Sequence, residues 1–261
     1  MLKVVGKKGI DKSEVRRILI RATNWVGDGV MTLPALEAIG RNFPESSITV
    51  LAKPWVLPLF QNHPVVDTVI PFRKEGTYGK RLGELFRIIR VIKRRRFDLA
   101  ILFQNAFEAA LLAFLAGVPF RLGYHTDGRG FLLTHGVIRD EEVLKVHQVV
   151  YYLSLLRAMD WEAPERDPSL RADPGDIEEA KERLRSSGIR ERDMLVGLSP
   201  GAIFGDAKRW PPERFAAIGD WAAKRWGAKI LVMGSRGEMD ICRALCSAMR
   251  EKSLNLCGRT F

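Results

Sequence analysis

The loop Ser199–Pro211 has the residue types of an anion-binding site. It follows an expected buried strand, 195–198, and precedes an expected helix that begins near Pro212. Backbone N–H groups at a helix start have no partner within the helix, and the helix dipole adds partial positive charge there. Lys208 and Arg209 add full positive charges. The loop therefore indicates a site for a phosphate or diphosphate, although a tight turn with a solvated Lys-Arg pair explains the same residues.

A second glycine-containing turn, Asn24–Val30, follows the first expected strand, 17–22. Open α/β sheets bind ligands outside the carboxyl ends of their strands, so this turn lies where a ligand is expected. Gly27 and Gly29 permit a tight turn. Asp28, at the following helix start, is either a helix N-cap or a general base that faces the ligand. The turn lacks the Gly-x-Gly-x-x-Gly spacing, which disfavours dinucleotide binding.

A third turn, Met233–Glu238, also follows an expected strand and contains glycines. It can cradle a nucleotide, with Glu238 accepting hydrogen bonds from ribose hydroxyls, although the sequence alone favours a plain helix-start carboxylate. Basic residues near other strand ends, Lys53, Arg121 and Arg129, are candidates for binding an anionic acceptor. The histidines show no metal-ligand spacing and no Asp-x-Asp motif is present, so we expect neither a metal nor another cofactor.

The elements that position these turns alternate between strand and helix. In the first half, strands are expected at 17–22, 48–52, 68–72, 99–103 and 120–123, and helices at 29–42, 80–96, 107–116 and 143–159. This alternation predicts an α/β fold with a parallel sheet and crossover helices. A polar stretch with three prolines, 161–174, indicates a linker. We therefore expect two domains, 1–162 and 163–261.

The second half repeats the alternation in a shorter form. Helices are expected at 177–186, 212–226 and 238–250, and strands at 195–198, 229–233 and 254–257. A doubly wound domain has about five or six strands. We therefore expect an incomplete second domain that is weakly stable alone, with exposed apolar surface and an unpaired edge beside its last strand.

The composition is that of an ordinary globular protein with excess positive charge. The chain has 261 residues and a formal net charge of +11, which favours anionic partners. No zinc-finger or RNA-recognition pattern supports nucleic acid among them. No apolar run approaches the roughly 20 residues of a membrane span, no signal peptide is evident, and the three cysteines lack Cys-x-x-Cys spacing. We expect a cytoplasmic protein.

Residues 87–96 form the basic end of an expected amphipathic helix. Positive charge suits the C-terminus of a helix, and a solvated face is the usual interpretation of such a run. The alternative is contact with anionic membrane headgroups, which would make the protein peripheral at a membrane surface.

Taken together, these segments resemble the bacterial lipopolysaccharide heptosyltransferases over nearly the whole chain. The matching segments are Asn24–Asp28, Gln104–Phe107, Ala116–Pro119, Pro200–Pro211, the Gly234-Ser235 turn and Asn255–Thr260. The resemblance implies a GT-B architecture, in which two Rossmann-like domains face each other across a cleft. It also implies an inverting transfer without a protein-held metal. The implied donor is ADP-L-glycero-β-D-manno-heptose, and the implied acceptor is the heptosylated Kdo–lipid A inner core.

The resemblance also assigns roles to residues. Asp28 falls on the family's catalytic aspartate, Lys208 on its phosphate-binding lysine and Glu238 on a ribose-contacting glutamate. The remaining expected donor contacts are Gly201, Arg209 and Ser235. The expected acceptor contacts are Asn24, Trp25, Lys53, Asn105, Arg121 and Arg129.

One departure from the family pattern bears on activity. The family carries a later Asp-Ser-Gly-x-x-His segment that helps to bind the donor, and this chain lacks it. We therefore expect a fragment or a natural truncation with poor donor affinity and negligible turnover. Two alternatives remain open: a GT-B transferase that uses another nucleotide sugar, and a glycolipid-binding module without catalysis.

Overall fold

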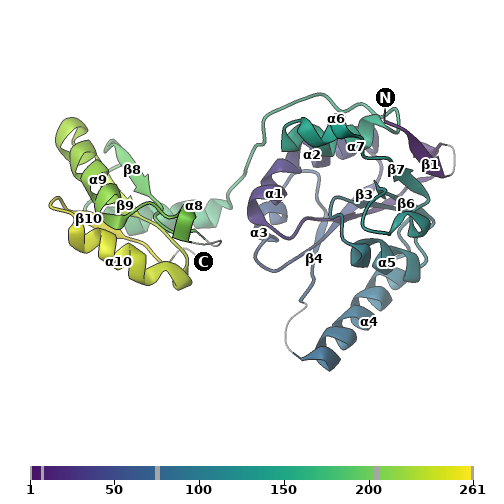
Figure 1. Ribbon diagram of the computed structural model, residues 1–261, viewed down its shortest axis with the longest axis horizontal. Coiled ribbons are helices and arrows are strands. Elements are labelled where there is room, and N and C mark those ends of the chain that lie inside the picture. Colours follow the sequence, from purple (N-terminus) through teal and green to yellow (C-terminus); the bar gives the residue numbers. More distant parts are fainter. Residues whose placement is uncertain (1, 7–8, 74–76, 203–205, 260–261) are drawn as a thin grey trace. The chain divides into compact units, whose positions relative to one another are not determined.

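The computed structural model describes residues 2–6, 9–73, 77–202 and 206–259. The chain divides into two compact units, Met1–Ala172 and Asp173–Phe261 (Figure 1). This division falls later than the boundary expected after residue 162. Ala163 lies beyond the expected boundary, yet it is buried in the core of the first unit together with Trp161. The Trp161 ring packs edge-on against Phe43, with 4.9 Å between the ring centroids.

The first unit is built around a sheet in which seven described strands have the order β1-β7-β6-β5-β2-β3-β4. The strands are β1 Val4–Gly6, β2 Arg17–Arg21, β3 Ser47–Ala52, β4 Thr68–Pro71, β5 Leu99–Leu102, β6 Phe120–Tyr124 and β7 His135–Val137. The β1–β7 pair is antiparallel, and the other neighbouring pairs are parallel. Parallel strands are covered on both faces, and all four residues of β5 are accordingly apolar and buried.

Helices cover both faces of this sheet. They are α1 Val26–Met31, α2 Leu33–Asn42, α3 Pro58–Gln61, α4 Tyr78–Arg95, α5 Phe107–Leu115, α6 Glu141–Lys145 and α7 Gln148–Arg157. Successive residues of β2 face opposite sides. Ile18 and Ile20 join a core with α2 and α7, whereas Leu19 joins a second core with α4 and α5.

The structure differs from the sequence prediction at a few elements of this unit. The expected helix over 29–42 is two helices, α1 and α2, which meet at Thr32. Pro34 explains the break, because it lacks an N–H donor and fits only in the first turn of a helix. The prediction also missed β1 and β7, since three residues are too few to show an alternating pattern.

The second unit has three described strands, all parallel, in the order β10-β9-β8. They are β8 Leu195–Leu198, β9 Lys229–Val232 and β10 Ser253–Asn255, and the helices are α8 Pro174–Ser186, α9 Pro212–Trp226 and α10 Met239–Ala248. Ile230 and Val232 of β9 pack with Cys242 and Leu245 of α10 in the core. The expected strands and helices of this half are all present, and the predicted α/β class is confirmed. Among the described helices, none combines the length and apolar character of a membrane-spanning segment.

Candidate active site

The sheet of the first unit has a topological switch point between β2 and β5. From β2 the chain proceeds to β3 and β4 on one side, and from β5 to β6 and β7 on the other. Ligands of open α/β sheets bind in the crevice that such a reversal leaves at the carboxyl ends of the strands. The turn with Asp28 follows β2, and Asn105 follows β5. The two sequence motifs therefore meet at the expected binding edge.

Asp28 is the third residue of α1 and is half-buried. The N-cap position belongs to Trp25, whose side chain makes no capping hydrogen bond, so the N-cap interpretation of Asp28 does not hold. The two glycines of the turn differ in what requires them. A Cβ on Gly29 would lie 2.8 Å from Leu59 Cδ1, whereas a Cβ on Gly27 would meet open space. Gly29 therefore allows α1 to approach α3, and neither glycine has a positive φ angle.

Tyr152 of α7 is a neighbour of Asp28 that the sequence prediction missed. Burial raises the pKa of the Tyr152 phenol, and the negative charge of Asp28 adds to that shift. The Tyr152 ring also packs edge-on against Phe103, with 5.5 Å between centroids. The phenol is thus a neutral group beside the candidate base. The adjacent tyrosines at 151 and 152, on a predicted helix, were the available signal.

Asn24 and Lys53 are held at the carboxyl edge of β2 and β3 by buried and aromatic neighbours. Arg21 is 1% exposed and donates from Nη2 to Asn24 Oδ1 at 3.1 Å. Trp55 Nε1 donates to the Asn24 carbonyl at 2.9 Å. Lys53 Nζ lies 4.9 Å from the centroid of the Phe72 ring. The structure therefore brings these two predicted acceptor contacts together, and Trp25 beside them is exposed.

Arg21 is a second residue that the sequence prediction missed. Burial lowers its pKa to about 10, and the nearby Glu108 opposes that shift. Its Nη1 donates to the Ala22 carbonyl at 2.6 Å, whereas its Nε is buried without a hydrogen-bond partner in the described structure. A charged residue at the end of an apolar strand gave no sign of burial, because strand ends usually reach solvent.

Arg121 and Arg129 were predicted to act together, and the structure separates them. Arg121 lies in the first half of β6, where its guanidinium donates to the carbonyls of Val118 and Leu132. Arg129 is fully buried near the other end of β6 and donates to the Tyr124 carbonyl at 3.0 Å. Each guanidinium is held by backbone carbonyls, so we no longer assign either arginine as a direct acceptor contact.

Asn105, in contrast, lies at the switch point and is half-buried. Its Oδ1 accepts from Arg129 Nη2 at 3.1 Å, and its Nδ2 donates to the Tyr151 hydroxyl at 2.8 Å. Asn105 therefore stays a candidate acceptor contact, whereas Arg129 lies behind it.

In the second unit, two of the predicted donor loops meet at Glu238. Its Oε2 accepts from Ser235 N at 2.7 Å and from Ser235 Oγ at 2.8 Å. The bond from Ser235 N, together with the bond from the Glu238 N–H to the Ser235 side chain, forms a capping box at the start of a 3-10 turn, Arg236–Glu238. Its Oε1 faces Gly201, where an added Cβ would lie 1.8 Å from that oxygen. The helix-start role of Glu238 is therefore present, and only glycine fits at position 201 without moving the carboxylate.

The cationic part of the first donor loop lies between β8 and α9 in the chain. Lys208 ends a 3-10 turn, Asp206–Lys208, and is exposed. Arg209 donates from Nη2 to the Ala202 carbonyl at 3.0 Å, which ties the two ends of the loop together. Residues 203–205 of this loop and Thr260 of the last matching segment lie outside the described residues.

The turn after β9 rests on two buried thiols. A Cβ on Gly234 would lie 2.9 Å from Cys242 Sγ and 3.2 Å from Cys257 Sγ, so glycine is needed for this close approach. Burial, and to a lesser degree Cys257, raises the pKa of the Cys242 thiol to about 12. Cys242 therefore packs as a neutral thiol beneath the turn, beside the buried Cys257.

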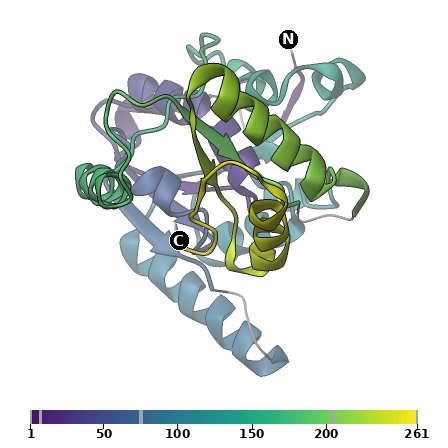
Figure 2. The same ribbon diagram turned by 90° about the vertical axis from the view of Figure 1, so that its left-hand side faces the viewer.

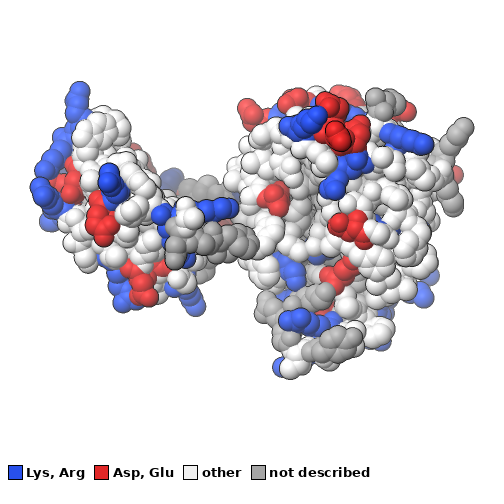
Figure 3. Space-filling view, viewed as in Figure 1, with Lys and Arg blue, Asp and Glu red and all other residues white. Residues whose placement is uncertain are grey.

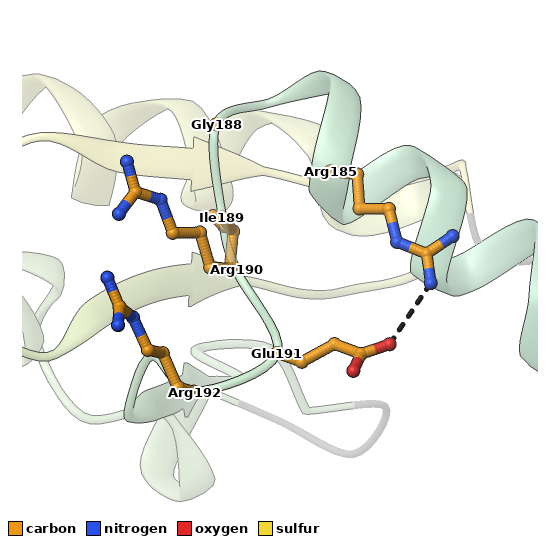
Figure 4. A pocket seen from close by; sticks show the side chains of 6 residues that line it. All are labelled: Arg185, Gly188, Ile189, Arg190, Glu191 and Arg192. Atoms are coloured by element: carbon orange, nitrogen blue, oxygen red, sulfur yellow. Dashed lines mark hydrogen bonds and ion pairs between the residues drawn. The ribbon is translucent and has the colours of Figure 1, made fainter.

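A cavity of about 570 Å³ lies elsewhere, between α8 and β8. It is lined by Arg185, Gly188, Ile189, Arg190, Glu191 and Arg192. Figure 4 shows Arg190 and Arg192 extending to the same side, while Arg185 pairs with Glu191 at 3.0 Å. This cavity borders the amino end of β8, opposite the edge where ligands of parallel sheets bind, so we do not include it in the site. Within the described residues, no three His, Cys, Asp or Glu side chains gather as metal ligands.

Comparisons with known proteins identify a family for this chain. Residues 85–261 match the family described as glycosyltransferase family 9 (heptosyltransferase). The chain is 29% identical to lipopolysaccharide heptosyltransferase 2 of Escherichia coli K12, over 94% of this chain and 72% of that protein. It is 30% identical to lipooligosaccharide heptosyltransferase 2 of Haemophilus ducreyi, with the same two coverages.

A solved structure extends the likeness to three dimensions. The E. coli ADP-heptose lipopolysaccharide heptosyltransferase II matches with a TM-score of 0.77 at 26% identity, over 93% of this chain and 73% of that chain. The predicted GT-B class, with Rossmann-like domains and parallel sheets, is thereby confirmed. The chain belongs to glycosyltransferase family 9, the heptosyltransferase family.

Proposed function

We propose that this protein transfers heptose from ADP-L-glycero-β-D-manno-heptose to the heptosylated Kdo–lipid A inner core of lipopolysaccharide. The observation that carries this proposal is the half-buried carboxylate of Asp28 at the topological switch point. The relatives named as heptosyltransferases support the choice of donor and acceptor. In this proposal the first unit binds the acceptor and the second unit binds the nucleotide sugar.

Asp28 is the proposed general base of an inverting displacement. As the acceptor hydroxyl oxygen bonds to the anomeric carbon, Asp28 takes the hydroxyl proton. The bond between that carbon and the diphosphate breaks, and ADP leaves with the electron pair. The sugar carries oxocarbenium character in between, as in glycoside hydrolysis, with an alcohol in place of water. The neutral Tyr152 phenol beside Asp28 adds no competing charge.

The leaving diphosphate is the proposed ligand of the Lys208 loop. Negative charge gathers on ADP as the bond breaks, and preorganised positive groups stabilise such charge most in a water-poor site. Lys208 supplies a full charge, and α9 begins at Pro212 just after the loop. Glu238 and Ser235 are proposed to bind the ribose, with Gly201 leaving room for the carboxylate between the two turns.

Asp28→Asn tests the proposed function most directly. In a complete enzyme it should lower kcat by about 10²- to 10⁴-fold and leave ADP affinity unchanged. Asp160→Asn is a matched control, because Asp160 is exposed at a positive φ that asparagine also accepts. ADP release with ADP-heptose, ADP-glucose and UDP-glucose would measure both variants. Near-normal turnover of Asp28→Asn rejects the base, and equal use of all three donors rejects the heptose assignment.

The finer location proposed is the anionic inner face of the inner membrane, reached through α4. On the face drawn in Figure 3, positive and negative residues are interspersed. Helix α4, in contrast, carries exposed Arg90, Lys93 and Arg94, and its acidic Glu84 is paired with Arg87 at 2.6 Å. The helix projects past the other elements of the first unit (Figure 1, Figure 2).

An apolar side chain accompanies these charges, since Phe86 of α4 is 66% exposed. Basic residues near an anionic surface contribute about 1 kcal/mol each. Replacing Arg90, Lys93 and Arg94 with Gln should weaken sedimentation with anionic liposomes, most at low salt. The matched control replaces Lys181, Arg183 and Arg185 of α8, which form ion pairs with Glu178, Glu179 and Glu182. Equal binding by both triple variants rejects the α4 surface.

A further inference from the structure

Arg129 is a buried cation whose hydrogen bonds converge on one turn. Its side chain is fully buried, and it donates to the carbonyls of Gln104 and Tyr124 and to Asn105 Oδ1. Gln104 and Asn105 form the turn that leaves β5 at the switch point. Burying a charge is costly unless it is well hydrogen-bonded, so a guanidinium placed here holds this turn in a defined shape.

The Asn105 amide has one orientation in this setting. Arg129 only donates, so the atom facing it at 3.1 Å is the Asn105 oxygen. The Asn105 Nδ2 then donates to the Tyr151 hydroxyl at 2.8 Å. An amide group has two N–H donors and an oxygen with two lone pairs. One N–H and one lone pair of Asn105 therefore remain beyond these two bonds.

The turn is also tied to the strand that leads to the candidate base. The N–H groups of Phe103 and Gln104 both donate to the Arg21 carbonyl, at 3.1 and 3.3 Å. Helix α7 contacts α1, the helix of Asp28. Tyr151 and Tyr152 are neighbours on α7. The Tyr151 hydroxyl accepts a hydrogen bond from Asn105, and the Tyr152 phenol interacts electrostatically with Asp28.

We propose that Arg129 and Tyr151 are positioning residues that hold the Asn105 amide in one orientation, so that its remaining N–H binds a hydroxyl of the sugar acceptor. The inference rests on the proposed function for the identity of the acceptor. Neither Arg129 nor Tyr151 touches the acceptor itself. The alternative is that this network only stabilises the core. Breaking the network lowers the affinity for the acceptor under the positioning role, and it leaves that affinity unchanged under the alternative.

Tyr151→Phe and Tyr124→Phe form a matched pair for the test. The two rings stack at 4.4 Å between centroids, and both are buried. Tyr124→Phe removes the hydroxyl that donates to the Tyr151 carbonyl at 2.6 Å and leaves Asn105 untouched. Tyr151→Phe removes only the hydroxyl that accepts from Asn105. Each loss should lower Tm by about 2–4 °C.

The acceptor constants separate the two variants. Tyr151→Phe should raise the acceptor KM by about 5- to 10-fold with the ADP-heptose KM unchanged. Tyr124→Phe should leave both constants at wild-type values. Arg129→Met should raise the acceptor KM further. If this variant does not fold, the comparison of Tyr151→Phe with Tyr124→Phe still tests the positioning role. A second measurement, calorimetric binding of a heptosyl-Kdo oligosaccharide, does not need turnover and should show the same order.

The outcomes distinguish this inference from the function on which it rests. With an active wild-type protein, equal acceptor constants for Tyr151→Phe and Tyr124→Phe overturn the positioning role and leave the proposed function standing. A wild-type protein that neither transfers heptose to this oligosaccharide nor binds it overturns the proposed acceptor, and this inference with it. Weaker oligosaccharide binding confined to Tyr151→Phe supports the positioning role even without turnover.

Discussion

Adding one methyl group at Gly201 should disable the donor loops through Glu238. An alanine Cβ at this position would lie 1.8 Å from Glu238 Oε1, 2.1 Å from Cδ and 2.7 Å from Cγ. The φ angle of Gly201 is not in the left-handed region, so alanine is compatible with the backbone. The whole effect therefore passes through the Glu238 side chain, whose Oε1 must withdraw by about 1.6 Å or more to reach ordinary van der Waals contact.

The expected cost follows from the hydrogen bonds that such a movement breaks. Glu238 Oε2 accepts from Ser235 N at 2.7 Å and from Ser235 Oγ at 2.8 Å. A capping interaction of this kind is worth about 1 kcal/mol, and two hydrogen bonds to a carboxylate about 1–2 kcal/mol at a partly exposed site. If the Ser235 turn binds ribose only in its capped form, ADP affinity should fall by about 5- to 30-fold.

Calorimetric ADP binding and thermal unfolding of Gly201→Ala measure this directly. Gly237→Ala is the control, because its Cβ would meet only Ser235 Oγ at 3.9 Å, an ordinary contact in the same loop. A double-mutant cycle with Glu238→Ala isolates the clash. In that background Gly201→Ala should have almost no further effect. An equal loss in both backgrounds refutes the reasoning and points to a contact of Gly201 that does not involve Glu238.

Three further outcomes are expected. Lys208→Ala should weaken ADP binding by about 10- to 100-fold and adenosine binding hardly at all. Lys229→Ala, at the opposite end of the sheet, should change neither affinity, and equal losses of both affinities in Lys208→Ala would indicate a folding defect. Arg121→Met should destabilise the first unit by about 1–3 kcal/mol, because two carbonyls lose their donor. An altered acceptor KM in this variant would instead show that Arg121 binds the acceptor. Burial lowers the pKa of His63 below 6.5, so as pH falls through that value the unfolded chain takes up the proton first and stability declines. His63→Asn, which keeps an acceptor for the Val65 N–H, should flatten this decline in urea unfolding between about pH 7 and pH 5, and an unchanged slope would contradict the assignment.

The sequence by itself determined the order of elements and the places where chemistry is expected. Apolar runs, helix starts and glycine-containing turns are local properties, so β2, β5 and β8 and the turns that follow them were predicted close to where they lie. The carboxyl-end rule for parallel sheets then placed Asp28 and Lys208 at binding edges. Their roles remain predictions that the proposed variants test.

The tertiary structure decided which side chains share a site. Arg121 and Arg129 look alike in the sequence, yet one is bound in the first half of β6 and the other lies behind Asn105. The hydrogen bond between Asn105 and Tyr151 joins residues 46 positions apart. Such partners depend on β5 lying beside β2 and on the face of the sheet that α7 covers. Local propensity carries no information about strand order, because a buried strand has the same composition whichever neighbours it pairs with.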